Sequence, residues 1–390
     1  MRITTIDCHI LTDPGIEVES TSSAQDDIVV EIRTDEGLVG VGETDLSPHI
    51  ARACIEAPGS HTMARGLSEM LLGSDPTDVE AIWEELYVGS AMNGRRGALI
   101  HALGALDLAL HDLRGKALNV PCYEQLGTLR EAPVIPYASL QPEEAGFDAY
   151  VRSLTGWARQ AHAFGFTAAK LEITPAGPYA HRGMTAPYER WVEPIAAVRE
   201  AVGPDFTIMV DVQYAFPSVE VCLKTTEAWH PYDVYFLEAP LWPDDLDGYA
   251  RLAREQPIAI AAGEWLATRW EFRELLERGQ VSVAQPDVAR VGGLTEAMRV
   301  CRLAADYGAR IVPHAWKTGI SVAAAAHMAA VTPHCAFIEY LPPELCSSSL
   351  RRQLVADGPT MVDGQIVMPD RPGLGIELDR DALERFAVSA

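Results

Sequence analysis

The sequence predicts an α/β protein: a barrel of eight parallel strands that alternate with helices, preceded by a smaller α+β domain. Three observations lead to this prediction. Short apolar runs recur along the chain, amphipathic helical segments separate them, and most runs end on a chemically capable polar side chain. Near-continuous apolar strands alternating with helices are typical of a parallel sheet, and eight such strands close a barrel. The runs are 133–140, 167–173, 207–213, 234–240, 258–265, 281–287, 309–315 and 336–341.

Residues 1–130 follow a different pattern and form the predicted α+β domain. A strand is expected at 3–11, and residues 27–44 predict two strands around an Asp-Glu-Gly turn. Residues 12–27 between them form a long polar loop, and long loops are often lids over functional sites. Apolar residues at three- and four-residue spacing then predict three helices, at about 50–72, about 77–90 and about 95–117.

The rest of the chain divides at about residue 345. Residues 131–345 hold the predicted barrel, with its active site expected at the strand C-termini, although the helix after the eighth strand has only a weak pattern. Residues 346–390 predict a hairpin and a short helix. We expect this C-terminal segment to return to the N-terminal domain and pack on it.

The composition limits the kinds of partner that the protein can bind and indicates its cellular compartment. The chain has 55 Asp and Glu against 31 Lys and Arg, a formal net charge of −24, and an acidic surface repels nucleic acids and anionic membranes. The seven cysteines are scattered without a CxxC pair, which predicts reduced thiols in a cytoplasmic protein. We expect neither a signal peptide nor a membrane span, so the expected partner is a small molecule.

Three carboxylates, Asp211, Glu238 and Glu264, end three successive strands about 25 residues apart. The C-terminal ends of barrel strands face one mouth, where three anions repel one another strongly. A hard divalent cation removes this repulsion, and Mg²⁺ prefers oxygen ligands. Each carboxylate alone could cap a helix or pair with an arginine instead, but three in register favour a magnesium site. Zinc is not expected, because no Cys or His shares the set.

Asp287 and His314 end the next two strands. A carboxylate beside a histidine fixes its tautomer and raises its basicity, which makes His314 a candidate general base, although a lone strand histidine is often structural. Lys170 and Glu172 lie two apart on the second strand and point to the same face. Lys170 could bind a substrate anion or act as a second base; the alternative is an ion pair with Glu172 that fills the barrel top.

These motifs resemble the enolase superfamily, in its mandelate racemase-like branch, over nearly the whole chain. The stretches "MVDVQ", "FLEAP" and "AAGEW" resemble the family's three metal-ligand strands, "QPDVARVGGLTEA" and "IVPHAWKTGI" the strands of its Asp–His dyad, and "FIEY" its eighth strand. The helix "GALIHALGALDLALHDLRGKALNVPCYEQLG" is similar to the end of the family's capping domain. The resemblance implies a modified TIM-type (β/α) barrel with an α+β capping domain, in a homo-oligomer.

The resemblance also implies roles for these residues. The family removes a proton next to a carboxylate, and Mg²⁺ stabilises the anion that forms. His314, oriented by Asp287, would be the base, and the three carboxylates named above would hold the metal together with the substrate carboxylate. Glu339 on the eighth strand, protonated with a raised pKa, would donate a hydrogen bond to the other substrate oxygen.

The sequence departs from the family pattern at two positions. Branch members often carry Lys-x-Lys on the second strand, whose second lysine is the base on the opposite face, whereas here Glu172 stands in its place. The third strand often reads Asp-x-Asn, or Asp-x-His in some dehydratases, whereas here Gln213 follows Asp211 by two residues. No histidine acid is therefore expected on that strand.

With one clear base, elimination is the reaction we favour. His314 would take the α-proton and return it to a β-hydroxyl leaving from the same face, so that an acid sugar becomes a 2-keto-3-deoxy acid, the reaction of an acid-sugar dehydratase. One alternative is a cycloisomerase of a sugar-acid lactone, or a racemase or epimerase using Lys170 or Glu172 opposite His314. Another is a barrel that only binds metal. We further expect Gln213, His49 and Lys317 to contact the substrate.

Overall fold

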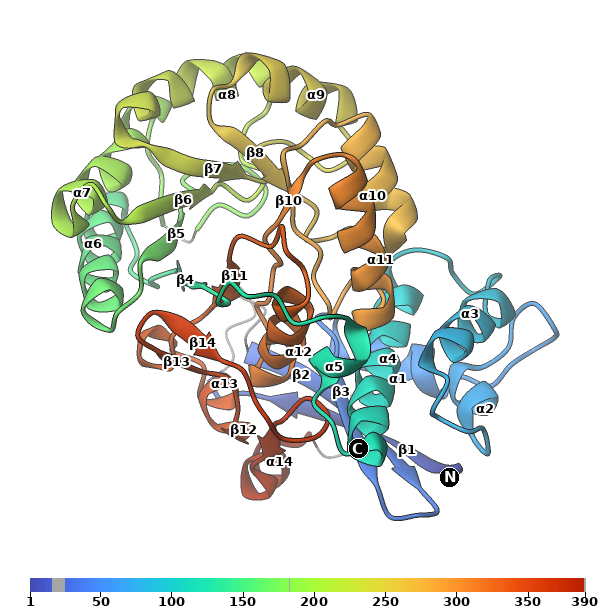
Figure 1. Ribbon diagram of the computed structural model, residues 1–390. Helices are drawn as coiled ribbons and strands as arrows, with labels where there is room; N and C mark the ends of the chain where they lie inside the picture. The colour runs from blue at the N-terminus through green and yellow to red at the C-terminus, as the bar shows by residue number, and fades with distance from the viewer. Residues whose placement is uncertain (16–24, 182, 389–390) are drawn as a thin grey trace.

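The computed structural model describes residues 1–15, 25–181 and 183–388, and shows a barrel with an α+β domain packed against it (Figure 1). The loop predicted as a lid, about 12–27, falls largely outside the described residues. Within the described ranges, no helix is both long and apolar enough to cross a membrane.

The N-terminal domain is an antiparallel three-stranded sheet covered by helices. Its strands, in the order β1-β2-β3, are β1 (Ile3–Thr12), β2 (Asp26–Thr34) and β3 (Val39–Glu43). The predicted turn between the last two holds Gly37 at φ +82°, where a glycine is favoured because it carries no Cβ. The helices are α1 (Pro48–Glu56), α2 (Leu67–Leu71), α3 (Val79–Gly89), α4 (Ala98–Leu118) and α5 (Cys122–Leu126).

The prediction of one helix over about 50–72 was wrong, because the structure has two short helices there. Helix α1 ends at Glu56, and Ala57 after it is extended, with φ −58° and ψ 130°. Pro58 follows, and a proline disfavours the helical conformation of the residue before it and cannot donate to a helical carbonyl. The helical pattern therefore resumes only at α2.

The eight predicted barrel strands are confirmed and pair in parallel in the order β10-β9-β8-β7-β6-β5-β4-β11. A parallel bridge between Ile311 and Cys335 joins the two edges of this sheet, and the sheet curls on itself in Figure 1. The strands are β4 (Pro136–Leu140), β5 (Ala168–Glu172), β6 (Thr207–Asp211), β7 (Val234–Glu238), β8 (Ala259–Ala262), β9 (Val283–Ala284), β10 (Arg310–Ile311) and β11 (Ile338–Tyr340).

Seven helices follow the first seven barrel strands and form the outer layer seen in Figure 1. The eighth position holds only a 3₁₀ turn and a five-residue helix, in agreement with the weak pattern after residue 341. The helices are α6 (Phe147–Ala163), α7 (Val192–Val202), α8 (Val219–Thr226), α9 (Leu246–Glu255), α10 (Thr268–Glu277), α11 (Gly293–Asp306) and α12 (Gly319–Ala330). The 3₁₀ turns are η2 (Tyr188–Arg190), η3 (Glu227–Tyr232) and η4 (Pro343–Leu345), and α13 (Ser349–Gln353) follows the last.

The barrel interior has an apolar floor to which nearly every strand contributes one buried side chain. Its members are Tyr137, Ala168, Met209, Phe236, Ala261, Val283 and Val312. Because side chains alternate along a strand, residues two positions further on point the same way. The floor therefore fixes which residues face the barrel axis one layer higher, toward the C-terminal ends of the strands.

The C-terminal segment contacts the N-terminal domain. It contains β12 (Val355–Asp357), β15 (Glu377–Leu378), the hairpin of β13 (Thr360–Val362) and β14 (Gln365–Val367), and α14 (Arg380–Phe386). Arg380 pairs with Glu31 of β2 at 2.7 Å, and the Val388 N–H donates to the carbonyl of Ile10.

The close packing of β3 on α4 generates a stability prediction. A Cβ on Gly42 would lie 2.0 Å from the carbonyl oxygen of Ala105, whereas a Cβ on Gly156 of α6 would meet nothing within 4 Å. Gly42→Ala should lower the free energy of unfolding by about 1–3 kcal/mol through overpacking. Gly156→Ala should raise it by up to about 1 kcal/mol through helix propensity. Urea unfolding measures both, and equal effects would contradict the close approach.

Candidate active site

The polar layer above the apolar floor forms the candidate site. Counting two residues on from six of the floor positions gives Ser139, Lys170, Asp211, Glu238, Gln285 and His314, and Glu339 follows Phe337, which packs against the floor, by two residues. Each comes from a different strand or strand end. Glu264 follows Gly263, which has φ +125°, and this conformation brings its carboxylate into the same layer. All these residues are buried. Six of the eight predicted catalytic and metal-binding residues therefore lie in this layer, and the other two, Glu172 and Asp287, follow Lys170 and Gln285 by two residues.

The predicted dyad is present in the structure. His314 Nδ1 lies 2.5 Å from Asp287 Oδ2, and Asp287 Oδ1 accepts a hydrogen bond from the Ala289 N–H at 2.7 Å. Burial lowers the pKa of His314, but the charges of Glu339, Asp287 and Glu264 outweigh it and raise the pKa to about 9. The ring nitrogen Nε2 faces Glu264 Oε2 at 3.2 Å, so the dyad points into the carboxylate cluster.

Lys170 is the cation at the centre of this cluster. Its ammonium lies 2.8 Å from Glu238 Oε1, 3.0 Å from Glu339 Oε1 and 3.7 Å from Asp211 Oδ2. Glu238 also accepts a hydrogen bond from Gln285 at 2.6 Å. The structure does not show the alternative, an ion pair between Lys170 and Glu172. Lys170 instead points toward the carboxylates of other strands.

The cluster carries more negative charge than its cations balance. Glu172, Asp211, Glu238, Glu264 and Glu339 are all less than 10% exposed, while Lys170 and Arg290 are the charged amine and guanidinium beside them. Burial raises the pKa of Asp211, and repulsion from Glu238 raises it further. Such a surplus of buried anions with oxygen donors fits a hard divalent cation.

The three predicted metal ligands do not all meet in the structure. Asp211 and Glu238 are register partners on β6 and β7 and share Lys170. Glu264 instead accepts a hydrogen bond from the Tyr214 hydroxyl at 2.6 Å and faces His314.

Among the described residues, a tighter group of possible ligand atoms is Asp45, Asp287 and His314, which lie within 4.8 Å of one another. Its charge is already balanced, because Arg290 pairs with Asp45 at 2.5 Å and lies 3.8 Å from Asp287. The surplus of negative charge therefore lies with the strand-end carboxylates rather than here.

Glu339 differs from its prediction. The expected protonated carboxyl with a raised pKa is wrong: although burial raises the pKa, the charges of Lys170 and His314 lower it well below its usual range. Hydrogen bonds from the Ser139 hydroxyl at 2.7 Å and the Ala315 N–H at 2.8 Å hold the ionised form. Neighbouring cations and donors decide the charge of Glu339, and the prediction had considered only the neighbouring anions.

Glu172 lies in the same cavity as the dyad. Burial raises its pKa to about 7, against the lowering effect of a 2.7 Å hydrogen bond from Gln141. It therefore occupies the place of the family's second lysine as a buried carboxyl group, held by an amide rather than by a cation.

A cavity of about 190 Å³ opens above the polar layer. Its lining contains six of the predicted residues, namely Lys170, Glu172, Asp211, Gln213, Glu264 and His314, with Ser139, Gln141, Tyr179, Tyr214, Trp265, Arg290 and Trp316. The predicted substrate contacts His49 and Lys317 are not part of this lining. His49 is exposed. Lys317 is buried, with its ammonium 2.8 Å from the Asp26 carbonyl oxygen and 3.4 Å from Asp45 Oδ1.

The sequence reasoning missed the ion pair of Asp45 with Arg290 and the aromatic residues of the cavity. Arg290 carried a signal, since it lies three residues after Asp287 in the "QPDVAR" stretch. Asp45 carried none, because it comes from the N-terminal domain, far away in sequence. Trp265 directly follows Glu264, and Trp316 follows His314 by two residues. Their position at the strand ends could therefore have indicated them.

The fold and this strand-end site define a member of the enolase superfamily. Residues 154–382 match the family described as enolase C-terminal domain-like. Residues 5–127 match the one described as mandelate racemase / muconate lactonizing enzyme, N-terminal domain. The chain belongs to this family, in its mandelate racemase-like branch, and the expected resemblance is confirmed.

Relatives in the family carry out different reactions. The chain is 33% identical to a D-galactarolactone cycloisomerase of Agrobacterium fabrum, over 100% of this chain and 99% of the relative. It is 32% identical to an L-rhamnonate dehydratase of Saccharopolyspora erythraea, over 96% and 90%. A solved racemase from Streptomyces coelicolor A3(2), with bound magnesium, is 27% identical with a TM-score of 0.83, over 99% of this chain and 100% of that one.

The buried Asp45–Arg290 pair generates the next prediction. Removing one partner of a buried ion pair leaves the other charge uncompensated, so Asp45→Asn should lower the free energy of unfolding by about 3 kcal/mol. The matched control is Glu220→Gln, which removes the partner of Arg251 in an exposed pair and should leave stability unchanged within error. Urea unfolding compares them. Equal small effects would show that the pair adds little to the fold.

Proposed function

We propose that the protein is an acid-sugar dehydratase, which removes the proton α to a carboxylate and then eliminates water. The observation that carries this proposal is the His314–Asp287 dyad, whose ring nitrogen Nε2 faces the cavity 3.2 Å from Glu264. An α-proton of a carboxylate is very weakly acidic, so a base alone does not suffice. The developing negative charge must be stabilised in the same cavity.

The oxygen-rich, anion-rich mouth fits Mg²⁺. Asp211, Glu238 and Glu264 would hold the ion, which would supply Lewis-acid stabilisation of the substrate carboxylate as negative charge develops on it. The solved racemase with bound magnesium supports this assignment for a protein of the same fold. Lys170, which already contacts Glu238 and Glu339, would add positive charge on the side of β5.

His314 would perform both proton transfers of the elimination. The neighbouring anions raise the pKa of His314 to about 9, and a divalent cation held by these carboxylates would offset their charge and lower that pKa. Neutral His314 would then take the α-proton at Nε2, while Asp287 holds the opposite ring nitrogen and stabilises the imidazolium that forms. The same nitrogen then returns the proton to the β-hydroxyl as its C–O bond breaks, so water leaves from the face on which the proton was removed. The enol product becomes a 2-keto-3-deoxy acid. Lys170 is held between Glu238 and Glu339, which disfavours it as a second base and favours elimination over a two-base inversion that would use it.

A cycloisomerase is the second candidate. The observation that favours it is the 33% identity to a D-galactarolactone cycloisomerase over the whole chain. The two reactions share the removal of the α-proton by His314. They differ in the leaving group, because in a lactone the departing β-oxygen belongs to the ring and no water is released.

The decisive experiment incubates the protein with Mg²⁺ and a library of acid sugars and sugar-acid lactones in D₂O. We expect a semicarbazide-reactive keto acid from an open-chain acid sugar, with loss of water seen by mass spectrometry. His314→Asn should abolish both this product and α-proton exchange, because its amide cannot accept the proton. Exchange with inversion and no loss of water would overturn the dehydratase in favour of an epimerase. A product formed only from lactones, without loss of mass, would favour the cycloisomerase.

Metal binding has a readout that does not depend on turnover. At a Mg²⁺ concentration of about 100 times its Kd, binding to the folded state should stabilise the protein by about 2.7 kcal/mol. Glu238→Gln should lose most of this Mg²⁺-dependent shift in melting temperature. His314→Asn, which leaves the three carboxylates intact, should keep it. A shift in Glu238→Gln as large as that of the wild type would contradict the assignment of the ligands.

A further inference from the structure

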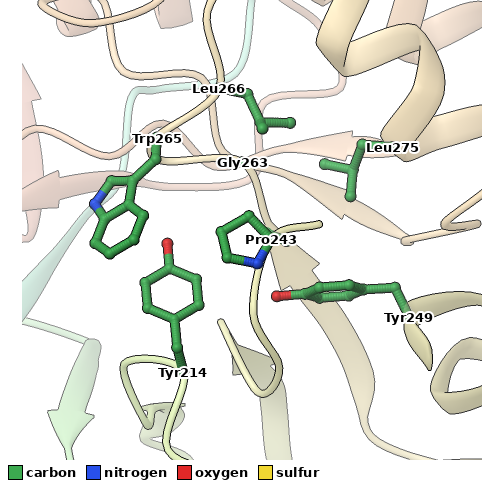
Figure 2. A pocket seen from close by; sticks show the side chains of 8 residues that line it. Tyr214, Pro243, Tyr249, Gly263, Trp265, Leu266 and Leu275 are labelled. Carbon is green, nitrogen blue, oxygen red and sulfur yellow. The ribbon is translucent and has the colours of Figure 1, made fainter. Parts of the chain in front are cut away.

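Three aromatic rings stand together on one side of the cavity. We call Tyr179, Tyr214 and Trp265 the aromatic wall. The ring centroids of Tyr214 and Trp265 are 4.3 Å apart with planes inclined by 37°, and Tyr179 meets Trp265 edge-on at 5.5 Å. Figure 2 shows the Tyr214 and Trp265 rings close together. All three members of the wall line the cavity that also contains His314.

The backbone that presents Tyr214 is strained. Gln213 has φ +43° and Tyr214 has φ +61°, two consecutive non-glycine residues in the left-handed region. This conformation is unfavourable for a residue that carries a Cβ. The Tyr214 N–H donates to the Ala239 carbonyl at 2.6 Å and its hydroxyl to Glu264 at 2.6 Å. Strain of this kind persists where the surroundings hold it, and it concentrates at functional sites.

The wall is backed by protein on its other side. Behind Tyr214 and Trp265, a space of only about 10 Å³ remains between them and Pro243, Tyr249 and Leu275 (Figure 2). That space is enough for about one water molecule and no organic ligand. The rings are therefore supported from behind, and the cavity of about 190 Å³ is the side on which they can meet a substrate.

The charges around the cavity disfavour a second carboxylate on the substrate. Among the described residues of the lining, the cationic side chains are Lys170, Arg290 and His314, and all three already pair with carboxylates. Glu172 adds a buried acid to the same lining. The faces of aromatic rings are also negative, so a dicarboxylic substrate would bring its distal charge against a π face or an acid.

We propose that the aromatic wall binds the C–H face of the carbon chain beyond the reacting carbons of a monocarboxylic sugar acid, and that it selects this class over dicarboxylic sugar acids. The inference rests on the proposed function, whose substrate class it narrows. Aromatic rings bury C–H surface with little loss of conformational entropy. The wall thus holds the substrate by its uncharged end while its carboxylate lies in the polar layer.

The experiment compares Trp265→Leu and Tyr179→Leu with Trp270→Leu. Trp270 is 37% exposed on α10 and serves as the matched control. For six-carbon monocarboxylic sugar acids, the two wall variants should raise KM about tenfold with little change in kcat. With glycerate, a three-carbon acid that keeps the α-proton and the β-hydroxyl, their KM should stay near that of the wild type. Trp265→Phe should restore most of the binding, since it keeps a ring.

The outcomes separate this inference from the dehydratase proposal. Wild-type kcat/KM should favour six-carbon monocarboxylic over dicarboxylic sugar acids by at least about tenfold. An equal or reversed preference overturns the inference, as does an unchanged KM in both wall variants. Calorimetric binding of the same acids to His314→Asn protein, with and without Trp265→Leu, needs no turnover. If the wild-type protein eliminates no water from any acid sugar while Trp265→Leu weakens binding to the His314→Asn protein, the dehydratase is overturned and the wall is upheld.

Discussion

The rest of the site depends on the five buried carboxylates around the barrel axis. Buried anions of like charge repel strongly, and an ionised carboxylate without a partner costs several kcal/mol to bury. Two cationic groups offset part of this repulsion. Lys170 lies between Glu238 and Glu339, and the surroundings of His314 raise its pKa and favour its protonated form. The same surplus that makes the mouth costly to fold makes it a good place for a divalent cation and for proton abstraction.

The N-terminal domain takes part in this balance. Its Asp45 pairs with Arg290, which lies beside both Asp287 and Glu264, so the position of the dyad's carboxylate depends on a residue from the other domain. Glu43, just before it, accepts hydrogen bonds from Thr318 and Ser321 at the start of α12. The docking of the domain therefore fixes the loops after β9 and β10, from which the two residues of the dyad come.

The sequence predicted what depends on local periodicity. Eight apolar runs predicted the barrel, and the polar residues at their ends predicted the dyad and the charged residues of the polar layer, because strand ends in a parallel barrel must meet. Ser139 and Gln285 of that layer were not predicted. The sequence could not predict the Asp45–Arg290 pair, which joins residues 245 positions apart. It also could not predict the ionised Glu339, whose charge depends on Ser139 of the neighbouring strand β4 and Lys170 of β5. Tyr214 escaped because its place depends on a left-handed backbone. Pro58 indicated that the helix ends near residue 57, but the prediction followed the helical pattern on both sides of the proline instead.

The leaving group, rather than the base, distinguishes the reactions that this family of sites can perform. A dehydratase and a lactone cycloisomerase both need one base and stabilisation of the developing anion, and the His314–Asp287 dyad with the surrounding carboxylates serves either equally well. The choice between the two reactions then depends on the part of the cavity that holds the rest of the substrate. An aromatic wall beside the polar layer favours a substrate with one charged end and one C–H-rich end. On these proposals, uncharged residues of the cavity would select the substrate and, through it, the leaving group, although a search for catalytic side chains passes over them.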